Sequence, residues 1–318
     1  MPTVYTRRAV LAKASAAAAL ALSLLEGCAR PARPVAAPAP PPDPVRAPVD
    51  IVVQGAVDSE LQPLLAALEG REQLQIAAWT FWRGRMAGQA VVVSRTEVGP
   101  VNASTATTLA IVNFRPRLII NQGTAGAVDP ELRLFDIVAG EATVDYGAFR
   151  SAHADAGAGV DLSRWTPMPH RLRLDGGERV AFERFPGDPA ALAAALAIPN
   201  PRGRVVKGVI GSAFEFNREV DRLIWVHKTY GAVSEDMESA FAAGTAAGFK
   251  VPFLAVRIIS DSDHQDVEFQ PVAGEHCAAF VVELVKALPA PLAANTPAAA
   301  AERRCPSATP GALRTPPG

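Results

Sequence analysis

The sequence predicts an α/β fold with three layers, in which helices flank a mixed, mostly parallel central sheet. Continuous apolar runs such as residues 118–121 and 251–259 are typical of strands that are buried on both faces. Between these runs lie segments whose apolar residues recur at helical spacing, as in residues 277–288. Alternation of the two patterns favours a sheet with helices on both faces.

The elements can be placed in order along the chain. The expected strands cover residues 51–54, 76–83, 89–96, 118–121, 135–142, 205–210 and 251–259. The expected helices begin near residue 59 and cover residues 100–113, 219–228 and 277–288. A turn of small residues is expected at 123–126. Residues 151–200 show no clear pattern.

The 318 residues divide by composition into four parts. Residues 1–28 form an export signal, and the Ala/Pro-rich residues 29–49 form an extended tether. A single globular domain is expected over residues 50–288. The tail at 289–318 repeats the Ala/Pro-rich composition and is expected to be disordered.

The first 28 residues predict export. Arg7 and Arg8 resemble a twin-arginine signature, and the apolar stretch at 14–25 is too short to span a bilayer in the mature protein. The sequence then resembles a lipobox that ends at Cys28, the residue that would be lipidated. We therefore expect a periplasmic protein anchored to the membrane only by a lipid on Cys28. The alternative is plain cleavage, which leaves a soluble protein.

Charge and ligand patterns exclude several classes of function. The 31 basic and 32 acidic residues nearly balance, which argues against nucleic-acid binding. The three cysteines and five histidines show no spacing typical of a disulfide or zinc site. Asp261, Asp263 and Asp266 lack the glycine and final glutamate of a calcium loop. No metal and no cofactor are expected.

Two acidic clusters instead suggest acid–base chemistry on a small molecule. The first occupies residues 234–240 (SEDMESA), and the second follows the apolar run that ends at Ile259 and includes Asp261. Asp261 therefore lies at the carboxyl end of a buried strand, where open α/β sheets place their ligands. Phosphate-binding loops, dinucleotide fingerprints and nucleophile elbows are missing from the sequence.

Four stretches resemble the nucleoside phosphorylase superfamily, and more closely its methylthioadenosine/S-adenosylhomocysteine nucleosidase branch. They are GAVDSE (55–60), IINQGTAG (119–126), DME (236–238) and RIISD (257–261). The resemblance spans nearly the whole domain and implies a nucleoside phosphorylase-like fold. It also implies that the substrate is a purine nucleoside, that no cofactor is needed and that the protein forms a homodimer.

The resemblance also implies which residues do the chemistry. Glu60 would be the base that activates water, and Asp261 the acid that protonates the purine at N7. An Asp at this position favours a 6-aminopurine, because a protonated carboxyl can donate to N7 while its carbonyl accepts from the amino group. A carboxyl near the sugar and a proton donor at the base suit a bond whose cleavage builds charge on both fragments.

Five further residues are expected to bind the substrate. The resemblance places Met237 and Glu238 at the ribose and Phe216 against the purine ring. Thr124 would lie near the ribose or the anion site, and Arg257 is expected beside these acidic groups. Structural roles remain open for several of them, since Arg257 could simply pair with a carboxylate and Phe216 could belong to the core.

The first loop distinguishes hydrolysis from phosphorolysis. Phosphorylases need cationic groups around the phosphate dianion, whereas the loop at 55–60 offers Asp58 and Glu60 and no basic residue. The sequence therefore predicts a purine nucleosidase that releases adenine from a 5′-modified ribonucleoside. The alternatives are a purine nucleoside phosphorylase, or a nucleoside-binding or storage protein that has lost its activity.

Overall fold

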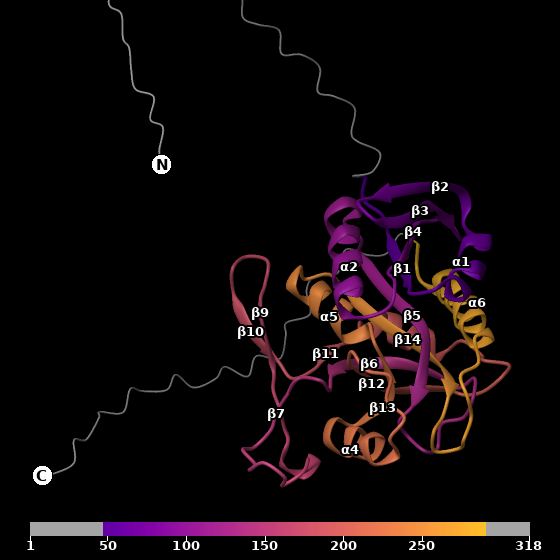
Figure 1. Ribbon diagram of the computed structural model, residues 1–318. Helices are drawn as coiled ribbons and strands as arrows, with labels where there is room; N and C mark the ends of the chain where they lie inside the picture. Colours follow the sequence, from indigo (N-terminus) through magenta and orange to yellow (C-terminus); the bar gives the residue numbers. More distant parts are fainter. Residues whose placement is uncertain (1–46, 291–318) are drawn as a thin grey trace, which may run out of the picture. The chain divides into compact units, whose positions relative to one another are not determined.

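The largest element of the fold is a ten-stranded sheet, seen in a computed structural model that describes residues 47–290 (Figure 1). Strand β5 (Leu118–Ala127) lies at its centre. One edge of β5 pairs with β1 (Ile51–Gly55) and, further along, with β13 (Ala232–Asp236). The other edge pairs with β14 (Phe253–Asp261). β5 therefore connects the segments that carry the sequence motifs.

Part of the sheet closes into a barrel. From β5 the pairing runs through β14, β6 (Ile137–Asp145), β12 (Val205–Ser212) and β13, which pairs with β5 again. The mixed sheet predicted from the sequence is confirmed. Closure was not foreseen, and five of the ten pairings in this sheet are antiparallel, so the sheet is less parallel than expected.

The other part of the sheet extends beyond β1 as an antiparallel meander. It contains β4 (Gln89–Arg95), β3 (Trp79–Met86) and β2 (Glu69–Ile76). Strand β2 was not predicted because its sequence, EGREQLQI, is largely polar and its first five residues are exposed. Pairing with β3 holds this segment in an extended conformation despite its low content of β-forming residues.

Successive residues of the central strands enter two different cores. In β1, Ile51 and Val53 pack into one hydrophobic cluster and Val52 into another. Because side chains alternate between the two faces of a strand, a strand covered on both sides needs a continuous apolar run. This arrangement explains the uninterrupted apolar sequences that predicted these strands.

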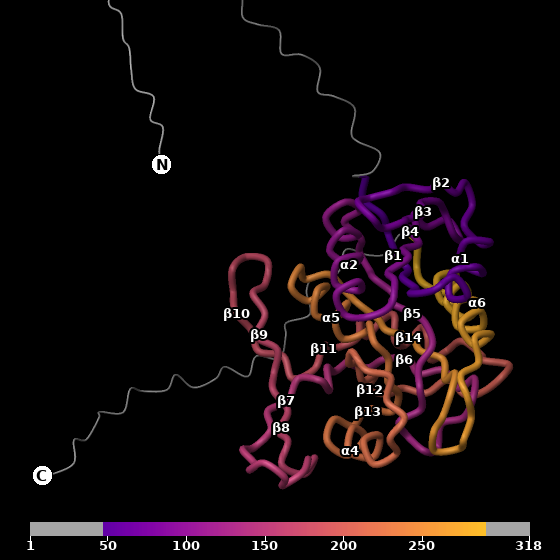
Figure 2. The backbone as a smooth tube through the Cα atoms, in the orientation of Figure 1, coloured from indigo at the N-terminus to yellow at the C-terminus, as the bar shows by residue number. Residues whose placement is uncertain are grey.

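Helices cover both faces (Figure 2). The first face packs against α1 (Gln62–Ala67), α3 (Pro189–Leu196) and α6 (Val272–Ala287). On the second face, α2 (Pro100–Phe114) and α5 (Ser239–Gly248) lie side by side. Helix α4 (Val220–Tyr230) packs beside β13. The predicted helices at 100–113, 219–228 and 277–288 are confirmed.

The segment without a clear sequence pattern forms small elements outside the main sheet. Strand β7 (Phe149–Arg150) pairs with β8 (Thr166–Pro167), and the short helix η3 (Leu162–Arg164) lies between them. The hairpin of β9 (His170–Arg173) and β10 (Arg179–Phe182) follows. The chain then returns to the sheet as β11 (Phe185–Pro186), which pairs with β6.

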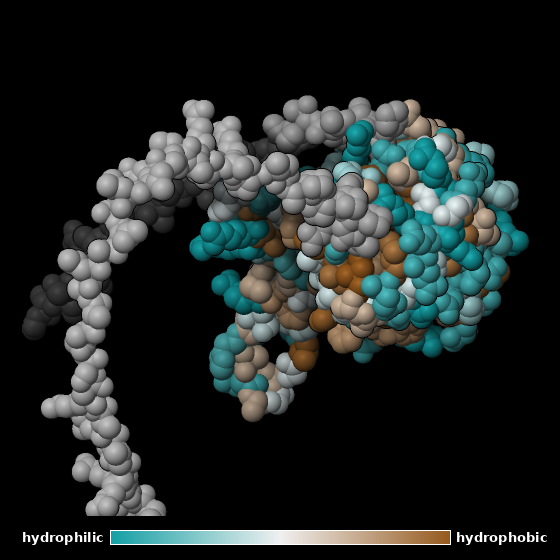
Figure 3. All heavy atoms as spheres, turned by 90° about the horizontal axis from the view of Figure 1, so that it is seen from above, coloured by the Kyte–Doolittle hydropathy of each residue, from teal (hydrophilic) through white to brown (hydrophobic). Residues whose placement is uncertain are grey.

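The described surface is mixed in character. On the face shown in Figure 3, hydrophilic residues surround small groups of hydrophobic ones. Among residues 47–290, no helix is both long enough and apolar enough to cross a membrane, and no cluster of acidic, histidine and cysteine side chains is suited to hold a metal ion. The export signal, Cys28, most of the tether and most of the tail lie outside the described residues, so those assignments stay predictions.

Candidate active site

Glu60 is held by a ring of donors at the carboxyl end of β1. It lies on the short helix η2 (Asp58–Glu60) and is 3% exposed. Its Oε2 accepts hydrogen bonds from the backbone N–H groups of Ala56 (2.7 Å) and Val57 (3.3 Å). Its Oε1 accepts from the N–H (2.9 Å) and the hydroxyl (3.1 Å) of Thr124. Four donors therefore fix the orientation of this carboxylate.

Gly123 makes this approach possible. A Cβ atom at position 123 would lie 2.7 Å from Oε1 of Glu60, which is closer than real side chains come. The small residues at 123–126 therefore serve a close contact with a neighbouring side chain. The prediction of a turn at 123–126 is wrong, since these residues continue β5 and pair with β13 and β14.

Glu238 joins the starts of two helices. It is the N-cap residue of α5, and its Oε1 accepts a 2.7 Å hydrogen bond from the N–H of Gly99, the N-cap residue of α2. Burial, reinforced by the charge of Asp236, raises the pKa of Glu238 to about 7, although Arg257 opposes the shift. The charge of Glu60 acts in the same direction as burial, so the two carboxyls lie within electrostatic reach of one another.

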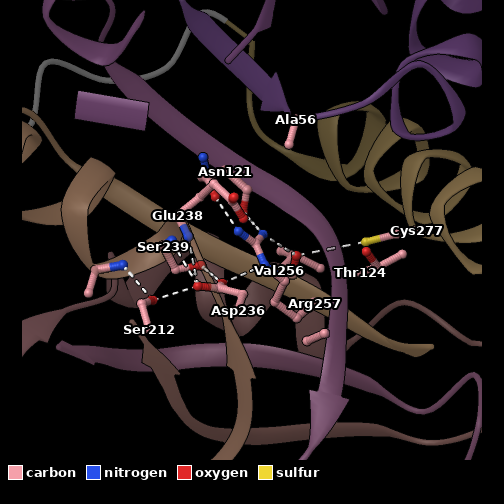
Figure 4. A network of polar contacts seen from close by, with 12 residues as sticks. Ala56, Asn121, Thr124, Ser212, Asp236, Glu238, Ser239, Val256, Arg257 and Cys277 are labelled. Atoms are coloured by element: carbon pink, nitrogen blue, oxygen red, sulfur yellow. Dashed lines mark hydrogen bonds and ion pairs between the residues drawn. The ribbon is translucent and has the colours of Figure 1, made fainter. Parts of the chain in front are cut away.

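Asp236 and Arg257 form a buried ion pair beneath Glu238 (Figure 4). The Nε of Arg257 lies 2.6 Å from Oδ2 of Asp236, and both side chains are at most 2% exposed. Asp236 also accepts hydrogen bonds from the hydroxyls of Ser212 and Ser239 and from the N–H groups of Glu238 and Ser239. The pair thus fixes the backbone at the start of α5.

Arg257 is occupied entirely by protein groups. Its two terminal nitrogens donate to the carbonyl oxygens of Asn121 and Val256 and to the Oδ1 of Asn121. Burial alone would lower its pKa, but the charges of Asp236, Glu238 and Glu60 outweigh burial and raise it. Arg257 is only 1% exposed and supports the carboxylates from within the core, and its expected contact with the substrate stays a prediction.

Asp261 is the last residue of β14, which extends two residues beyond the strand end predicted at Ile259. Its Oδ1 accepts a 2.6 Å hydrogen bond from the hydroxyl of Ser260. Burial raises the pKa of Asp261, the Ser260 hydroxyl offsets part of that shift, and the charge of Asp263 adds to it. A carboxyl with a raised pKa is suited to carry a proton.

The loop after β12 places two phenylalanines on the surface. Phe216, the residue expected to stack on the base, is 70% exposed and Phe214 is 73% exposed. Of the two, Phe214 lies against Gly99, the residue whose N–H binds Glu238, and a Cβ atom at Gly99 would be 3.0 Å from Cε2 of Phe214. Phe214 was not among the residues predicted from the sequence. Its place two residues after the end of a buried strand is a signal that could have identified it.

The remaining predicted residues lie around this group. Thr124 contacts Glu60 through its hydroxyl, and this contact gives it a defined role in orienting the carboxylate. Met237 is partly buried and connects β13 to α5 beside Glu238. The structure thus brings Glu60, Thr124 and Glu238 close together around the ends of β1, β5 and β13, with Asp261 at the end of the adjoining strand β14.

A mixed α/β barrel with buried carboxyls at its strand ends defines a site for acid–base chemistry on a small molecule. Comparison with known proteins specifies the family: the chain belongs to the phosphorylase superfamily, whose sequence model matches residues 50–286.

Several similar proteins carry the same name. The 5′-methylthioadenosine/S-adenosylhomocysteine nucleosidase of Tolumonas auensis is 29% identical over 244 residues, which cover 75% of this chain and 99% of that protein. The protein of the same name from Shewanella piezotolerans is 30% identical over 250 residues, which cover 75% of this chain and 99% of that protein. The corresponding Neisseria meningitidis structure, a complex with methylthio-immucillin-A, has a TM-score of 0.61 and 25% identity, and covers 76% of this chain and all of that one.

Proposed function

We propose that the domain hydrolyses the N-ribosidic bond of a purine nucleoside of the methylthioadenosine/S-adenosylhomocysteine type and releases adenine. The observation that carries this proposal is the position of Glu60 inside its ring of donors. The names and extensive coverage of the similar proteins support the same reaction.

The donors around Glu60 favour water over phosphate as the nucleophile. Adjacent N–H groups such as those of Ala56 and Val57 can form an anion-binding concavity. Here a carboxylate of the protein itself accepts their hydrogen bonds, so a phosphate dianion would meet a negative charge where it needs donors. A fixed carboxylate can instead accept a proton from water as the water attacks the sugar.

The two other carboxyls act on the two halves of the substrate. Glu238, with Met237, binds the ribose by accepting hydrogen bonds from its hydroxyls. Asp261 donates a proton to N7 as the bond breaks, which stabilises the negative charge on the purine. Its raised pKa supports this assignment. Phe214 or Phe216 stacks on the purine ring, and the contact between Phe214 and Gly99 favours Phe214.

One assay tests the reaction. The processed protein is incubated with methylthioadenosine, S-adenosylhomocysteine, adenosine and inosine, with and without phosphate, and free base is measured. We expect adenine from the first two substrates at a rate independent of phosphate. Strict phosphate dependence would establish a phosphorylase, and binding without release would establish a storage protein.

A pair of variants tests the role of Glu60. Glu60→Gln keeps the shape but cannot accept the proton, so kcat should fall by about 10²–10⁴-fold. Asp58→Asn is the matched control, because Asp58 lies on the same short helix but its side chain is 72% exposed and pairs with Arg95. Equal losses in both variants would remove Glu60 from the mechanism.

Export and anchoring are part of the proposal. Arg7 and Arg8 followed by a short apolar stretch support translocation, and the lipobox-like sequence that ends at Cys28 supports a lipid anchor. Expression of the full chain followed by membrane fractionation and mass spectrometry tests both. A Cys28→Ser variant should leave the membrane fraction, and an unchanged distribution would rule out the anchor.

A homodimer completes the proposal. Support comes from the resemblance and from exposed apolar side chains beside the site, Val101 at 76% and Phe214 at 73%. Light scattering coupled to size-exclusion chromatography measures the mass directly. A monomer at micromolar concentration would reject the dimer without affecting the proposed chemistry.

A further inference from the structure

A second carboxyl faces Asp261 across a glycine. Gly126 on β5 pairs with Glu235 on β13 at one edge and with Asp261 on β14 at the other. The three residues therefore form one row across three strands. A Cβ atom at Gly126 would lie 3.1 Å from Oδ2 of Asp261 and 3.8 Å from Oε1 of Glu235. Both carboxyls thus turn toward the space above the glycine, which has no side chain to separate them.

Glu235 is held in this position by one strong hydrogen bond. The hydroxyl of Tyr146, at the end of β6, donates to Oε2 of Glu235 over 2.8 Å, and Tyr146 is fully buried. The other oxygen, Oε1, is the one near Gly126. Glu235 is 9% exposed, and the roles assigned to Glu60, Glu238 and Asp261 make no use of it.

We propose that Glu235 is a positioning residue that stores the proton which Asp261 delivers to the purine, with Gly126 as the gap that lets the two carboxyls communicate. This inference rests on the proposed function, because it names the source of the proton in the same reaction. Glu235 itself does not touch the substrate.

The charges around the pair determine where the proton resides. Burial raises the pKa of Glu235 to about 7, the hydroxyl of Tyr146 opposes the shift, and the charges of Glu215 and Asp261 add to it. Asp261 faces Asp263, Arg218 and Glu268 as well as Ser260. Arg222 lies beyond Glu235, over the ring of Tyr146 and paired with Glu215. Since an ionised Asp261 keeps Glu235 protonated, the pair retains one proton near neutral pH.

The proton transfer balances without any further reactant. As the bond between C1′ and N9 breaks, its electron pair goes to the purine. The proton of Glu235 passes to Asp261, directly or through one water molecule, and Asp261 gives it to N7. Glu235 remains as a carboxylate that accepts the hydrogen bond from Tyr146. The attacking water releases one proton to Glu60. Before the next turnover Glu60 loses this proton to solvent, and Glu235 takes up one proton from solvent.

The test compares the pH dependence of kcat/KM in four variants of the full chain. In Glu235→Gln only Asp261 can hold the proton, and it loses this proton as the pH rises. The ratio of kcat/KM at pH 8 to that at pH 5.5 should therefore fall about tenfold. Glu235→Asp should restore the ratio. Tyr146→Phe removes a hydrogen bond that stabilises the Glu235 anion, so its ratio should rise. Asp58→Asn is the control, because this carboxyl is 72% exposed and pairs with Arg95, and it should change the ratio less than twofold.

Opposite shifts in Glu235→Gln and Tyr146→Phe support the proposal, since a merely structural role would lower activity equally at all pH values. A uniform loss, or shifts in the same direction, would overturn it. If the wild-type protein releases no base, the proposed function fails, and carboxyl ¹³C NMR titration then tests the pair separately. Coupled titration of Glu235 and Asp261, with a changed Asp261 midpoint in Glu235→Gln, supports communication across Gly126. Independent midpoints would disprove it.

Discussion

Gly123 lies directly against the Glu60 carboxylate, with no room for a β-carbon between them. The contact joins β5 to the loop after β1, so the sheet itself positions the carboxylate. Two of the four hydrogen bonds to Glu60 depend on this approach, because they come from Thr124, the next residue on β5.

Gly123→Ala should therefore displace Glu60 and reduce kcat by about 10²-fold, since a shift of about 1 Å at a catalytic group has effects of that size. Overpacking should also cost about 1–3 kcal/mol of stability. Gly248→Ala is the control, because a Cβ atom there meets its nearest neighbour at 3.9 Å. Full activity in Gly123→Ala, measured by adenine release, would show that Glu60 needs no exact position.

The Asp236–Arg257 pair should contribute strongly to stability. Arg257→Met leaves the carboxylate of Asp236 buried without its counter-charge and should reduce the free energy of unfolding by about 3–5 kcal/mol. Urea denaturation measures this loss. Lys286→Met breaks the exposed pair with Glu283 and should change stability by less than about 1 kcal/mol. Similar values for both variants would contradict a structural role for the buried pair.

The two exposed phenylalanines should differ in their effect on substrate binding. Phe214→Ala should raise KM roughly tenfold, because loss of stacking on one base costs about 1–3 kcal/mol. Phe216→Ala should stay within twofold, since only Phe214 is placed against Gly99. Steady-state kinetics of the two variants decide between them. A larger effect of Phe216→Ala would restore the assignment made from the sequence.

Stability should decrease as the pH rises from about 4.5 to 7. Burial in the folded state raises the pKa of Glu238 and of Glu235 to about 7 from the usual 4.5, so over this range the folded protein binds more protons than the unfolded chain. Each carboxyl should remove up to about 3 kcal/mol across the interval. Melting temperature measured against pH checks the slope, and Glu238→Gln should flatten it. A profile that rises with pH, or that Glu238→Gln leaves unchanged, would contradict this assignment.

Local sequence patterns were sufficient for much of the fold and part of the site. The apolar run of β1, the spacing of α6 and the DME and SD motifs identified their elements correctly, because burial on two faces and helical periodicity are properties of short segments. Glu60, Glu238 and Asp261 are found at strand or helix ends as expected. Patterns failed for β2 and for residues 123–126, where pairing with distant strands overrides local preference.

The sequence by itself determined the kind of chemistry, since carboxyls placed after buried strands specify acid–base groups. Only the tertiary structure decided which of those groups support the site from the core and which face one another. It buried Arg257 beneath the carboxylates, brought Phe214 to Gly99 and placed Glu235 opposite Asp261. The physical reason is that burial and strand register join residues far apart in the chain. A glycine whose missing side chain lets two carboxyls meet has no distinguishing mark until its neighbours on both strands are known.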